Sequence, residues 1–570
     1  MNGTVNAAMN AAAAGAVLAP PLPIAGAGSG APEALLLLAV LAPLALALAM
    51  LKPALRRRVP GLLVLAPLPA LAAALTVPRG MSVLVAPYPF RFMLALDGAG
   101  ALLLGGAALL WIAAGAYAAS YMRKDPARGA FATWWALTMA GSFAVFVVAD
   151  VASFYLAYAL VSFSAFGLVT HDDTVEARRA GNLYLALTVL GEAFLIAAFV
   201  MLASGASEAN PLIRDAVAAL PASPFRTAIV LLLLAGFTMK MGLFPLHVWM
   251  PLAHSVAPVP GSAALSGVVV KAGVIGLLRF LPEGVALPGW GEALTAVGLF
   301  TAFYGVALGV TQTHPKRALA YSTVSQMGVV GAVIGAAIAS GLPGAFPIAA
   351  FYAVNHMLLK GAMFLAAGLA MAAAPARARQ VALLAGLLGL SLAGLPFTGG
   401  ALAKYAIKIV VPGGLAGFLL TLSAAGSALL MARYALLVAA SGKPDKAPPA
   451  GIILPTLALA ALALAVPFVL FGPVTGLPLA AAFSADALAK GLWPVALGLA
   501  LAGLLAWRSW PLPEVPAGDI LHAMGPLKAL WRGISGLAVA ADGQLRRWPV
   551  AAAALIAMAA LLAAATAGGF

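Results

Sequence analysis

The stretch MKMGLFPLHVWMPLAHSVAPVPGSAALSGVVVKAGVIGLLR, residues 239–279, places two lysines inside apolar sequence of membrane-spanning length. Lys240 and Lys271 are each flanked on both sides by apolar residues. A lysine at mid-membrane is costly unless it is paired or hydrated, so its presence indicates a functional site. Pro245 follows Lys240 and removes a helical hydrogen bond, which predicts a broken helix at this point.

The whole chain has the same apolar character. Of its 570 residues, 64% are hydrophobic and only 9% are charged. A soluble protein of this length would split into several domains and carry far more charged surface. In lipid, only helices and closed barrels satisfy their backbone, and barrel strands alternate polar with apolar residues. The unbroken apolar runs of about 20 residues therefore predict an all-α integral membrane protein.

About sixteen membrane-spanning helices are expected. They lie near residues 33–51, 60–77, 98–121, 131–149, 151–170, 182–204, 227–250, 258–281, 292–312, 317–340, 344–372, 381–411, 414–440, 451–472, 488–507 and 548–568. Residues 1–32 form an N-terminal extension without the basic start of a secretory signal. Helices over 33–130 follow it, and residues 441–570 hold the C-terminal helices. Within these, residues 519–547 predict an amphipathic helix at the membrane surface, with a solvated linker as the alternative.

The basic residues give an orientation. The net charge of +15 would suggest nucleic acid in a soluble protein, but here the lysines and arginines gather in short loops. The basic clusters follow odd-numbered spans: Lys52/Arg56/Arg57/Arg58, Arg123/Lys124/Arg128, Arg178/Arg179, Lys316/Arg317, Arg377/Arg379, Lys443/Lys446 and the stretch 508–547. With these loops in the cytoplasm, both termini face outward across a bacterial inner membrane, and no nucleic-acid partner is expected.

Four lysines, three histidines and one glutamate lie inside the predicted spans. They are Lys240, Lys271, Lys360, Lys404, His247, His254, His356 and Glu192. Pro396 interrupts a second span just before Lys404, as Pro245 does after Lys240, and paired broken helices are typical of inverted-repeat transporters. Imidazole suits proton shuttling near neutral pH. The alternatives are snorkelling lysines, packing histidines and a Glu192 that only bonds a neighbouring helix.

Other residues have plainer readings. Asp97 and Asp150 stand at predicted helix starts and are expected to cap them.

The chain has no cysteine, which excludes thiolate zinc sites and protein-ligated iron–sulfur clusters. No phosphate-binding loop, nucleophile constellation or metal cluster is apparent. We therefore expect no cofactor and no catalytic residue in this chain, and any redox chemistry belongs to a partner.

The sequence resembles the proton-conducting membrane subunits of complex I and the related antiporter-type subunits. The similar stretches, besides 239–279, are HPKRALAYSTVSQMGVVG (314–331), NHMLLKGAMFLAAG (355–368), GLPFTGGALAKY (394–405) and LDGAGALLLGGAALL (96–110). The resemblance covers roughly residues 90–440 and leans towards the hydrogenase-4 and cation-antiporter branches. It implies two inverted five-helix repeats, over 131–281 and 292–440, and a hydrated polar axis at mid-membrane.

By motif position, the resemblance assigns roles to individual residues. Lys240 matches the lysine of the first broken helix, and Lys271 that of the following span. His356 and Lys360 match the family's His-and-Lys pair, and Lys404 the lysine after the second break.

One position departs from the family. Its fifth span usually carries a Trp-Glu motif, whose glutamate partners the first broken-helix lysine. Here DVASFYLAYALVSFSAFGLV (150–169) has Tyr158 and Ala159 at those positions. We hypothesise that Glu192 on the next span replaces the missing carboxylate. The alternative is a weakened or inactive first half-channel.

These observations predict a proton-translocating, non-catalytic subunit driven by redox chemistry elsewhere in a membrane complex. The expected complex is of the NADH–quinone oxidoreductase or membrane hydrogenase type, with other membrane subunits as partners. One alternative is a subunit of a multisubunit Na⁺/H⁺ antiporter, and H⁺ and Na⁺ both stay open as the transported ion. Another is a structural membrane anchor that has lost pumping.

Overall fold

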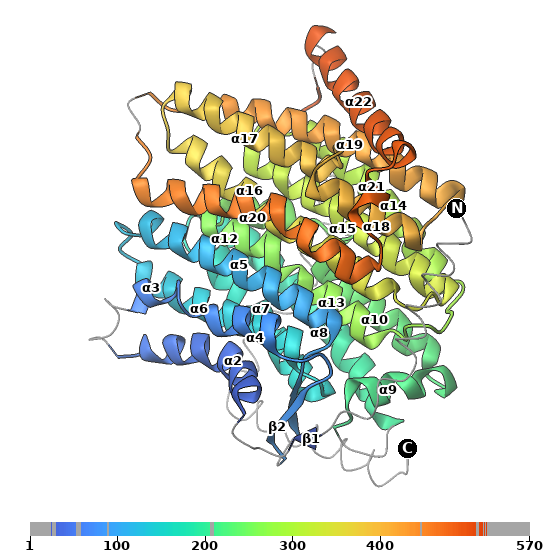
Figure 1. The fold of residues 1–570 in the computed structure, drawn as a ribbon. Coiled ribbons are helices and arrows are strands. Elements are labelled where there is room, and N and C mark those ends of the chain that lie inside the picture. Colours follow the sequence, from blue (N-terminus) through green and yellow to red (C-terminus); the bar gives the residue numbers. More distant parts are fainter. Residues whose placement is uncertain are drawn as a thin grey trace, which may run out of the picture. The chain divides into compact units, whose positions relative to one another are not determined.

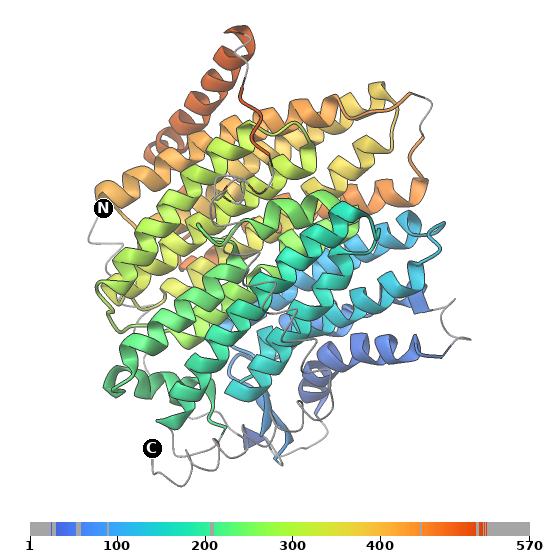
Figure 2. The same ribbon diagram turned by 180° about the vertical axis from the view of Figure 1, so that it is seen from behind.

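The computed structural model describes residues 24–25, 30–52, 59–87, 91–205, 210–444, 447–508, 512–516, 518 and 520. The predicted last span, 548–568, lies outside the described residues, as does nearly all of the predicted amphipathic segment 519–547. The described residues up to Pro516 form one compact unit, in which the helices lie side by side (Figures 1 and 2).

Among the described residues, thirteen helices are long and apolar enough to cross a membrane. They are α2 (Ala31–Ala49), α5 (Gly98–Tyr121), α6 (Arg128–Val147), α7 (Val151–Val169), α8 (Val175–Ser204), the continuous run Val259–Phe280, α14 (Trp290–Val310), α15 (Pro315–Ser340), α16 (Ala345–Met371), α17 (Pro375–Ala393), α19 (Gly414–Ala439), α20 (Ala450–Thr475) and α22 (Ala485–Arg508). The predicted class, an all-α membrane protein, is confirmed; the count of sixteen is not.

The difference in count has physical reasons. The span predicted at 60–77 is divided into α3 (Val59–Leu62) and α4 (Leu68–Thr76), with Pro67 at the start of the second piece. The span predicted at 227–250 is broken into α10 (Arg226–Met241) and α11 (Trp249–Val256). In these two spans, each piece is too short to cross a membrane alone.

Both predicted helix breaks are present, but a glycine rather than the proline ends each helix. α10 ends at Met241 and is followed by Gly242 with φ +74°, three residues before Pro245. α17 ends at Ala393 and is followed by Gly394 with φ +92°, two residues before Pro396. Glycine adopts this left-handed conformation at no steric cost, and the following proline prevents the helix from resuming. α18 (Gly399–Val410) then carries Lys404.

Two helices form the interior of the bundle. The run Val259–Phe280 consists of α12 (Val259–Ala264), a π-helical turn η2 (Leu265–Val269) and α13 (Lys271–Phe280). It and α16 are buried throughout their membrane-spanning windows. By contrast, α22 is mostly exposed in the described part of the chain and lies at its edge (Figure 1). The lysines of the two interior helices are therefore withdrawn from lipid.

The helices α14 and α15 pack unusually closely through glycines spaced seven residues apart. A side-chain carbon built at Gly305 would lie 2.6 Å from the backbone nitrogen of Ser325, and one at Gly328 would lie 2.6 Å from that of Ala302. Only glycine allows the two backbones this approach. We call this contact the glycine seam.

Outside the helices, the chain forms a small three-stranded sheet that the all-α prediction did not include. Strand β1 (Ile24–Ala25) pairs in parallel with β2 (Ser82–Ala86), which pairs antiparallel with β3 (Phe92–Ala95). β1 falls within the predicted N-terminal extension.

The two aspartates predicted as caps do cap helices, and both have further partners. Asp150 is buried and accepts hydrogen bonds from the backbone of Ser153 (2.8 Å) and Met93 (2.9 Å) and from the side chain of Asn210 (2.8 Å). Asp97 accepts from the backbone of Gly100 at the start of α5.

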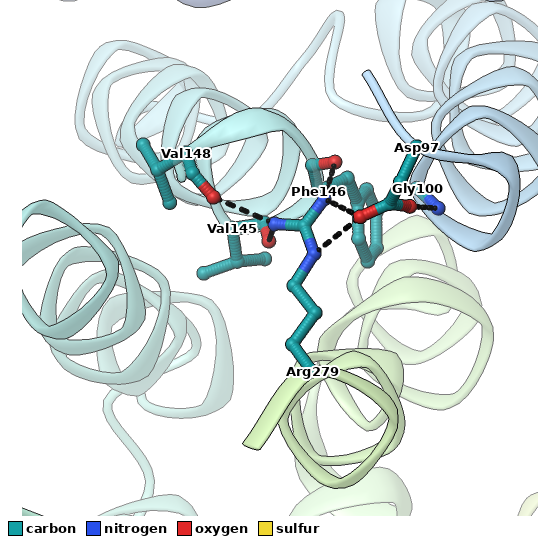
Figure 3. A network of polar contacts seen from close by, with 6 residues as sticks. All are labelled: Asp97, Gly100, Val145, Phe146, Val148 and Arg279. Carbon is teal, nitrogen blue, oxygen red and sulfur yellow. Dashed lines mark hydrogen bonds and ion pairs between the residues drawn. The ribbon is translucent and has the colours of Figure 1, made fainter. Parts of the chain in front are cut away.

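Asp97 also forms an ion pair that ties three helices together at one end (Figure 3). The Arg279 guanidinium on α13 lies 2.8 Å from the Asp97 carboxylate. It also donates to the backbone carbonyls of Val145, Phe146 and Val148 at the end of α6. A cation at a helix C-terminus neutralises carbonyls that have no helical partner.

Candidate proton pathway

The side chain of Lys240, in the last turn of α10, lies between two tyrosine rings. Its side chain is buried, and Nζ lies 3.4 Å from the Tyr184 hydroxyl on α8. Nζ also lies 5.4 Å from the ring centres of both Tyr158 and Tyr184. Tyr158 occupies the position where the family carries tryptophan, so an aromatic face still meets this lysine.

Glu192 and Lys240 line the same small cavity. This space of about 10 Å³ is just large enough for one water molecule. Glu192 is 4% exposed, and neither carboxylate oxygen makes a hydrogen bond of normal geometry within the described residues. Among the described residues, no ion pair shorter than 4.0 Å joins Glu192 to Lys240. If Glu192 replaces the family's fifth-span glutamate, it therefore lies near Lys240 without direct contact.

Lys271 begins α13 directly after the π-helical turn. Its Nζ lies 2.6 Å from Nδ1 of His356 on α16 and donates to the Ser266 carbonyl at 3.1 Å. The π-turn displaces the backbone hydrogen bonds by one residue, and such bulges often occur at functional sites. Nε2 of His356 is buried and has no partner within the described residues.

Lys360 lies one turn after His356 on α16 and is also fully buried. Its Nζ donates to the Leu319 carbonyl on α15 at 3.2 Å. His356 and Lys360, one turn apart on α16, therefore contact two different helices: His356 meets α13, and Lys360 meets α15.

His254, in the last turn of α11, has aromatic contacts in two directions, one toward Lys240 and one toward α16, the helix that carries Lys360. Its ring centre lies 5.2 Å from that of Phe364 on α16 and 6.5 Å from that of Trp249. Trp249 in turn lies 5.2 Å from Tyr184, beside Lys240. Both ring nitrogens of His254 are buried without partners in the described part of the chain.

His247 is buried in the interruption between α10 and α11. Its ring packs at 5.0 Å against Tyr304 and at 6.0 Å against Phe244. These aromatic contacts agree with the packing alternative for this histidine.

Lys404 is less enclosed than the other three lysines. Its stem packs against Gly394, where a side-chain carbon would lie 2.5 Å from the lysine Cδ. It lines a cavity with Lys408 and Lys490. A separate polar chain joins α16, α15 and α19: the Tyr352 hydroxyl donates to Gln326 (2.6 Å), whose amide donates to Ser427 (3.0 Å).

Lys316 was not predicted as a site residue, because its neighbour Arg317 and the following span suggested a loop cluster. In the structure its side chain is 5% exposed. Nζ donates to the carbonyls of Ala257 and Ser255, just after and within the last turn of α11. This buried cation therefore caps the helix that carries His254.

Among the described residues, no group of three or more His, Asp or Glu side chains could hold a metal ion. The buried ionisable groups of the described residues are amines, imidazoles, phenols and the carboxylates of Glu192 and Asp150. Groups of these kinds can accept and donate protons.

Residues 148–430 match the family model described as NADH:quinone oxidoreductase/Mrp antiporter, TM. Over this segment, the chain belongs to that family. The antiporter-type domain thus begins within residues 131–149, the fourth predicted span, and includes all eight candidate residues.

Curated relatives share this antiporter-type domain. Hydrogenase-4 component B of Escherichia coli (strain K12) is 31% identical over 301 residues, which are 49% of this chain and 44% of that protein. Na(+)/H(+) antiporter subunit A1 of Staphylococcus saprophyticus is 32% identical over 294 residues, 49% of this chain and 36% of that one. The chain therefore matches less than half the length of these relatives.

Solved structures extend the similarity beyond the antiporter-type domain at the level of the fold. The Mrp complex from Dietzia sp. DQ12-45-1b superposes with a TM-score of 0.71 at 23% identity and covers 95% of this chain and 63% of that one. The membrane-bound sulfane sulfur reductase, an archaeal respiratory membrane complex, superposes at 0.64 and 18% identity over 81% of this chain and all of that one.

Proposed function

We propose that this chain is a proton-translocating, antiporter-like subunit of a multisubunit membrane complex. Protons move along a row that begins at Glu192 and Lys240 and continues through His254, Lys271 with His356, and Lys360 to Lys404. The observation that carries this proposal is the direct contact of Lys271 with His356 inside helices that are fully buried. Two basic groups at this distance share a proton. Two side chains that only pack against each other would not need a shared proton.

Two steps of this row are supported by close contacts, between Lys240 and the Tyr184 hydroxyl and between Lys271 and His356. Lys240 reaches the Tyr184 hydroxyl, and Glu192 lies across a cavity that holds one water molecule. Proton transfer runs through hydrogen bonds or through one bridging water. A water bound between Glu192 and Lys240 would complete their pairing, so Glu192 takes the role of the glutamate that position 159 lacks.

We assign the driving force to redox chemistry in partner subunits, as in an NADH–quinone oxidoreductase or membrane hydrogenase. The chain has no cysteine with which to ligate an iron–sulfur cluster. The second candidate is a subunit of a Na⁺/H⁺ antiporter, which the superposition on the Mrp complex over 95% of this chain favours. Other membrane subunits and lipid are the partners in both cases. We place the chain in a bacterial inner membrane, with basic loops inside and both termini outside.

The third candidate, an anchor without transport, makes a different prediction. In an anchor, the buried lysines would serve packing only, and their replacement would change assembly or nothing. The unpaired Glu192 carboxylate and the absent glutamate at position 159 are the features in its favour.

One experiment separates these functions. The assembled complex is placed in proteoliposomes, and internal pH is followed for wild type, Lys240→Ala and Lys404→Ala. Lys124→Ala, an exposed loop lysine, is the matched control. Acidification that needs an electron donor and both lysines supports the redox-driven function. Na⁺-driven pH changes without a donor support the antiporter. Flux that is indifferent to both lysines, in assembled complexes, leaves only the anchor.

A further inference from the structure

A cavity of about 300 Å³ lies between α3, the end of α5 and the start of α6, separate from the proton row. None of the eight candidate residues of the row lines it. Most of its wall is apolar, with the side chains of Leu63, Phe131 and Trp135 buried. Among the described residues, the only charged ones that line it are Arg123 and Arg128. The cavity therefore combines an apolar wall with two cations.

The broken second span explains why this space exists. The span predicted at 60–77 is divided, and α3 contains only four residues before the turns that lead to α4. α3 packs against α6 (Figure 1) but is too short to cover the ends of α5 and α6 as a full helix would. On α5, a side-chain carbon added at Gly115 would meet no atom closer than 3.7 Å. Apolar walls without packing partners lose dispersion contacts, so a ligand that fills the space is favoured.

The charges at the cavity call for an anion. Arg123 directly follows the end of α5, and Arg128 is the first residue of α6. Asp125, between them in sequence, does not line the cavity. Its carboxylate lies 3.0 Å from Nε2 of His171 and accepts the backbone N–H of Ala127 at 2.7 Å. α6 has no acidic residue in its first turn, so the positive end of its helix dipole adds to the two guanidinium charges.

An anionic phospholipid matches both parts of this cavity. Guanidinium groups bind phosphate through two parallel hydrogen bonds, and the apolar wall suits an acyl chain. Basic pockets between membrane-spanning helices on the cytoplasmic side are typical sites for anionic lipid headgroups. Arginine does not lose its proton in proteins, so Arg123 and Arg128 cannot relay protons and the cavity is no branch of the row.

We infer that this cavity binds one anionic phospholipid, with its phosphate on Arg123 and Arg128 and the start of one acyl chain against Leu63 and Phe131. The lipid supplies the packing that the broken span leaves out and joins α3 to the ends of α5 and α6. Its place in the inner leaflet rests on the proposed orientation of the basic loops. The binding itself does not depend on proton transport.

The experiment uses the assembled complex, stripped of lipid in detergent, and a phosphatidylglycerol that carries a photoreactive diazirine on one acyl chain. After illumination, labelling of the peptides that contain the cavity wall is measured against lipid concentration. Arg123→Gln/Arg128→Gln removes the proposed phosphate site. Lys124→Gln is the matched control, because Lys124 is an exposed cation of the same loop that does not line the cavity.

We expect half-maximal labelling to require about 30-fold more lipid in the double variant, the effect of two cations near an anionic lipid, and an unchanged amount in Lys124→Gln. Unlabelled dioleoyl phosphatidylglycerol should compete, whereas dioleoyl phosphatidylcholine and glycerol 3-phosphate should not. Gly115→Leu, which fills the cavity and keeps both arginines, should prevent labelling of this wall. Gly61→Leu is a second filling variant, since an added carbon there meets nothing within 4 Å. Melting temperatures without lipid show which variants are folded.

Several results would overturn the inference. Equal labelling of wild type and the double variant, or equal competition by phosphatidylcholine, would mean that the arginines do not select an anionic lipid. Competition by glycerol 3-phosphate would make this a site for a free phosphate. Unchanged labelling in both folded filling variants would place the lipid outside the cavity. No labelling of the assembled wild-type complex would give this surface to a neighbouring subunit.

Discussion

Nζ of Lys271 lies 2.6 Å from Nδ1 of His356, so the two groups cannot both carry a positive charge without severe repulsion. One of them holds the proton that the other accepts. The Ser266 carbonyl accepts a hydrogen bond from Lys271 and supports its ammonium form. Nε2 of His356, which has no partner among the described residues, is available to pass a proton onward. This contact joins the two helices at the centre of the bundle.

Replacing this lysine should separate function from stability. Lys271→Met keeps the length of the side chain and removes a buried charge, which is often neutral or stabilising. We expect proton flux to fall by about 10²-fold or more, the usual contribution of a positioned acid or base. The melting temperature of the purified complex should not fall. A folded Lys271→Met complex with normal flux would remove this pair from the pathway.

The role of Glu192 is tested by moving the carboxylate. Glu192→Gln should abolish flux, because no other carboxylate of the described residues lines the Lys240 cavity. Ala159→Glu in the same chain returns the acid to the position that the family uses and should restore part of the flux. If Glu192→Gln transports normally while Lys240→Ala does not, the two residues are not partners.

The cluster at Arg279 should be structural rather than conductive. Arg279→Gln removes a buried cation from Asp97 and three backbone carbonyls, which should cost about 3 kcal/mol of folding free energy. Asp97→Asn should cost less, because this side chain is half-exposed and retains an acceptor oxygen. Thermal unfolding in detergent measures both. Flux per folded complex should stay normal; a selective loss of flux would place Arg279 in the pathway instead.

The second helix break should be intolerant of a single methyl group. A side-chain carbon at Gly400 would collide with the backbone carbonyl of Ser391, whereas one at Gly413 meets nothing within 4 Å. Gly400→Ala should therefore displace α18, lower the melting temperature and impair flux through Lys404. Gly413→Ala, the matched control in the next loop, should leave both unchanged. Equal behaviour of the two variants would contradict the described geometry of the break.

His314, at the start of α15, should make folding stability depend on pH. Burial, followed by the positive charges of Lys316 and Arg317, lowers its pKa to about 4. The folded state thus binds a proton less readily than the unfolded state, whose histidine titrates near 6.5. Its contribution to stability is complete above about pH 6.5 and is lost as the pH falls toward 4.

Melting temperatures of wild type and His314→Asn, compared between pH 4 and 8, test this dependence. Asparagine keeps the ability to cap the helix. The wild type should lose more stability than the variant as the pH falls. Parallel curves would show that His314 does not differ between the two states.

Much of the candidate pathway could be predicted from local sequence. Lys271 and Lys360 could be identified because unbroken apolar residues surround them on both sides, which only a membrane interior explains. The breaks near Pro245 and Pro396 were located within a few residues for the same local reason. At the first break the stop was assigned to Pro245, whereas Gly242 ends the helix, because a left-handed turn leaves no signal beyond the glycine itself.

The features of the site that could not be predicted from the sequence alone depend on distances between helices. Lys316 looked like one of a loop pair with Arg317, and only the packing of α11 over the start of α15 reveals its buried cap. The separation of Glu192 from Lys240 by one water-sized space is equally invisible in sequence. The partners of His356 and Lys360, which lie four residues apart but meet different helices, depend on the rotation of α16.

The glycine seam has a mechanical consequence. Two helices whose backbones touch along their length bend less than either would alone. We therefore expect α14 and α15 to behave as one stiff unit. Its base holds the end of α11 through Lys316, and a turn further along it holds Lys360 through the Leu319 carbonyl. Through these two contacts, the end of α11 and the lysine of α16 are mechanically coupled to the same pair of helices.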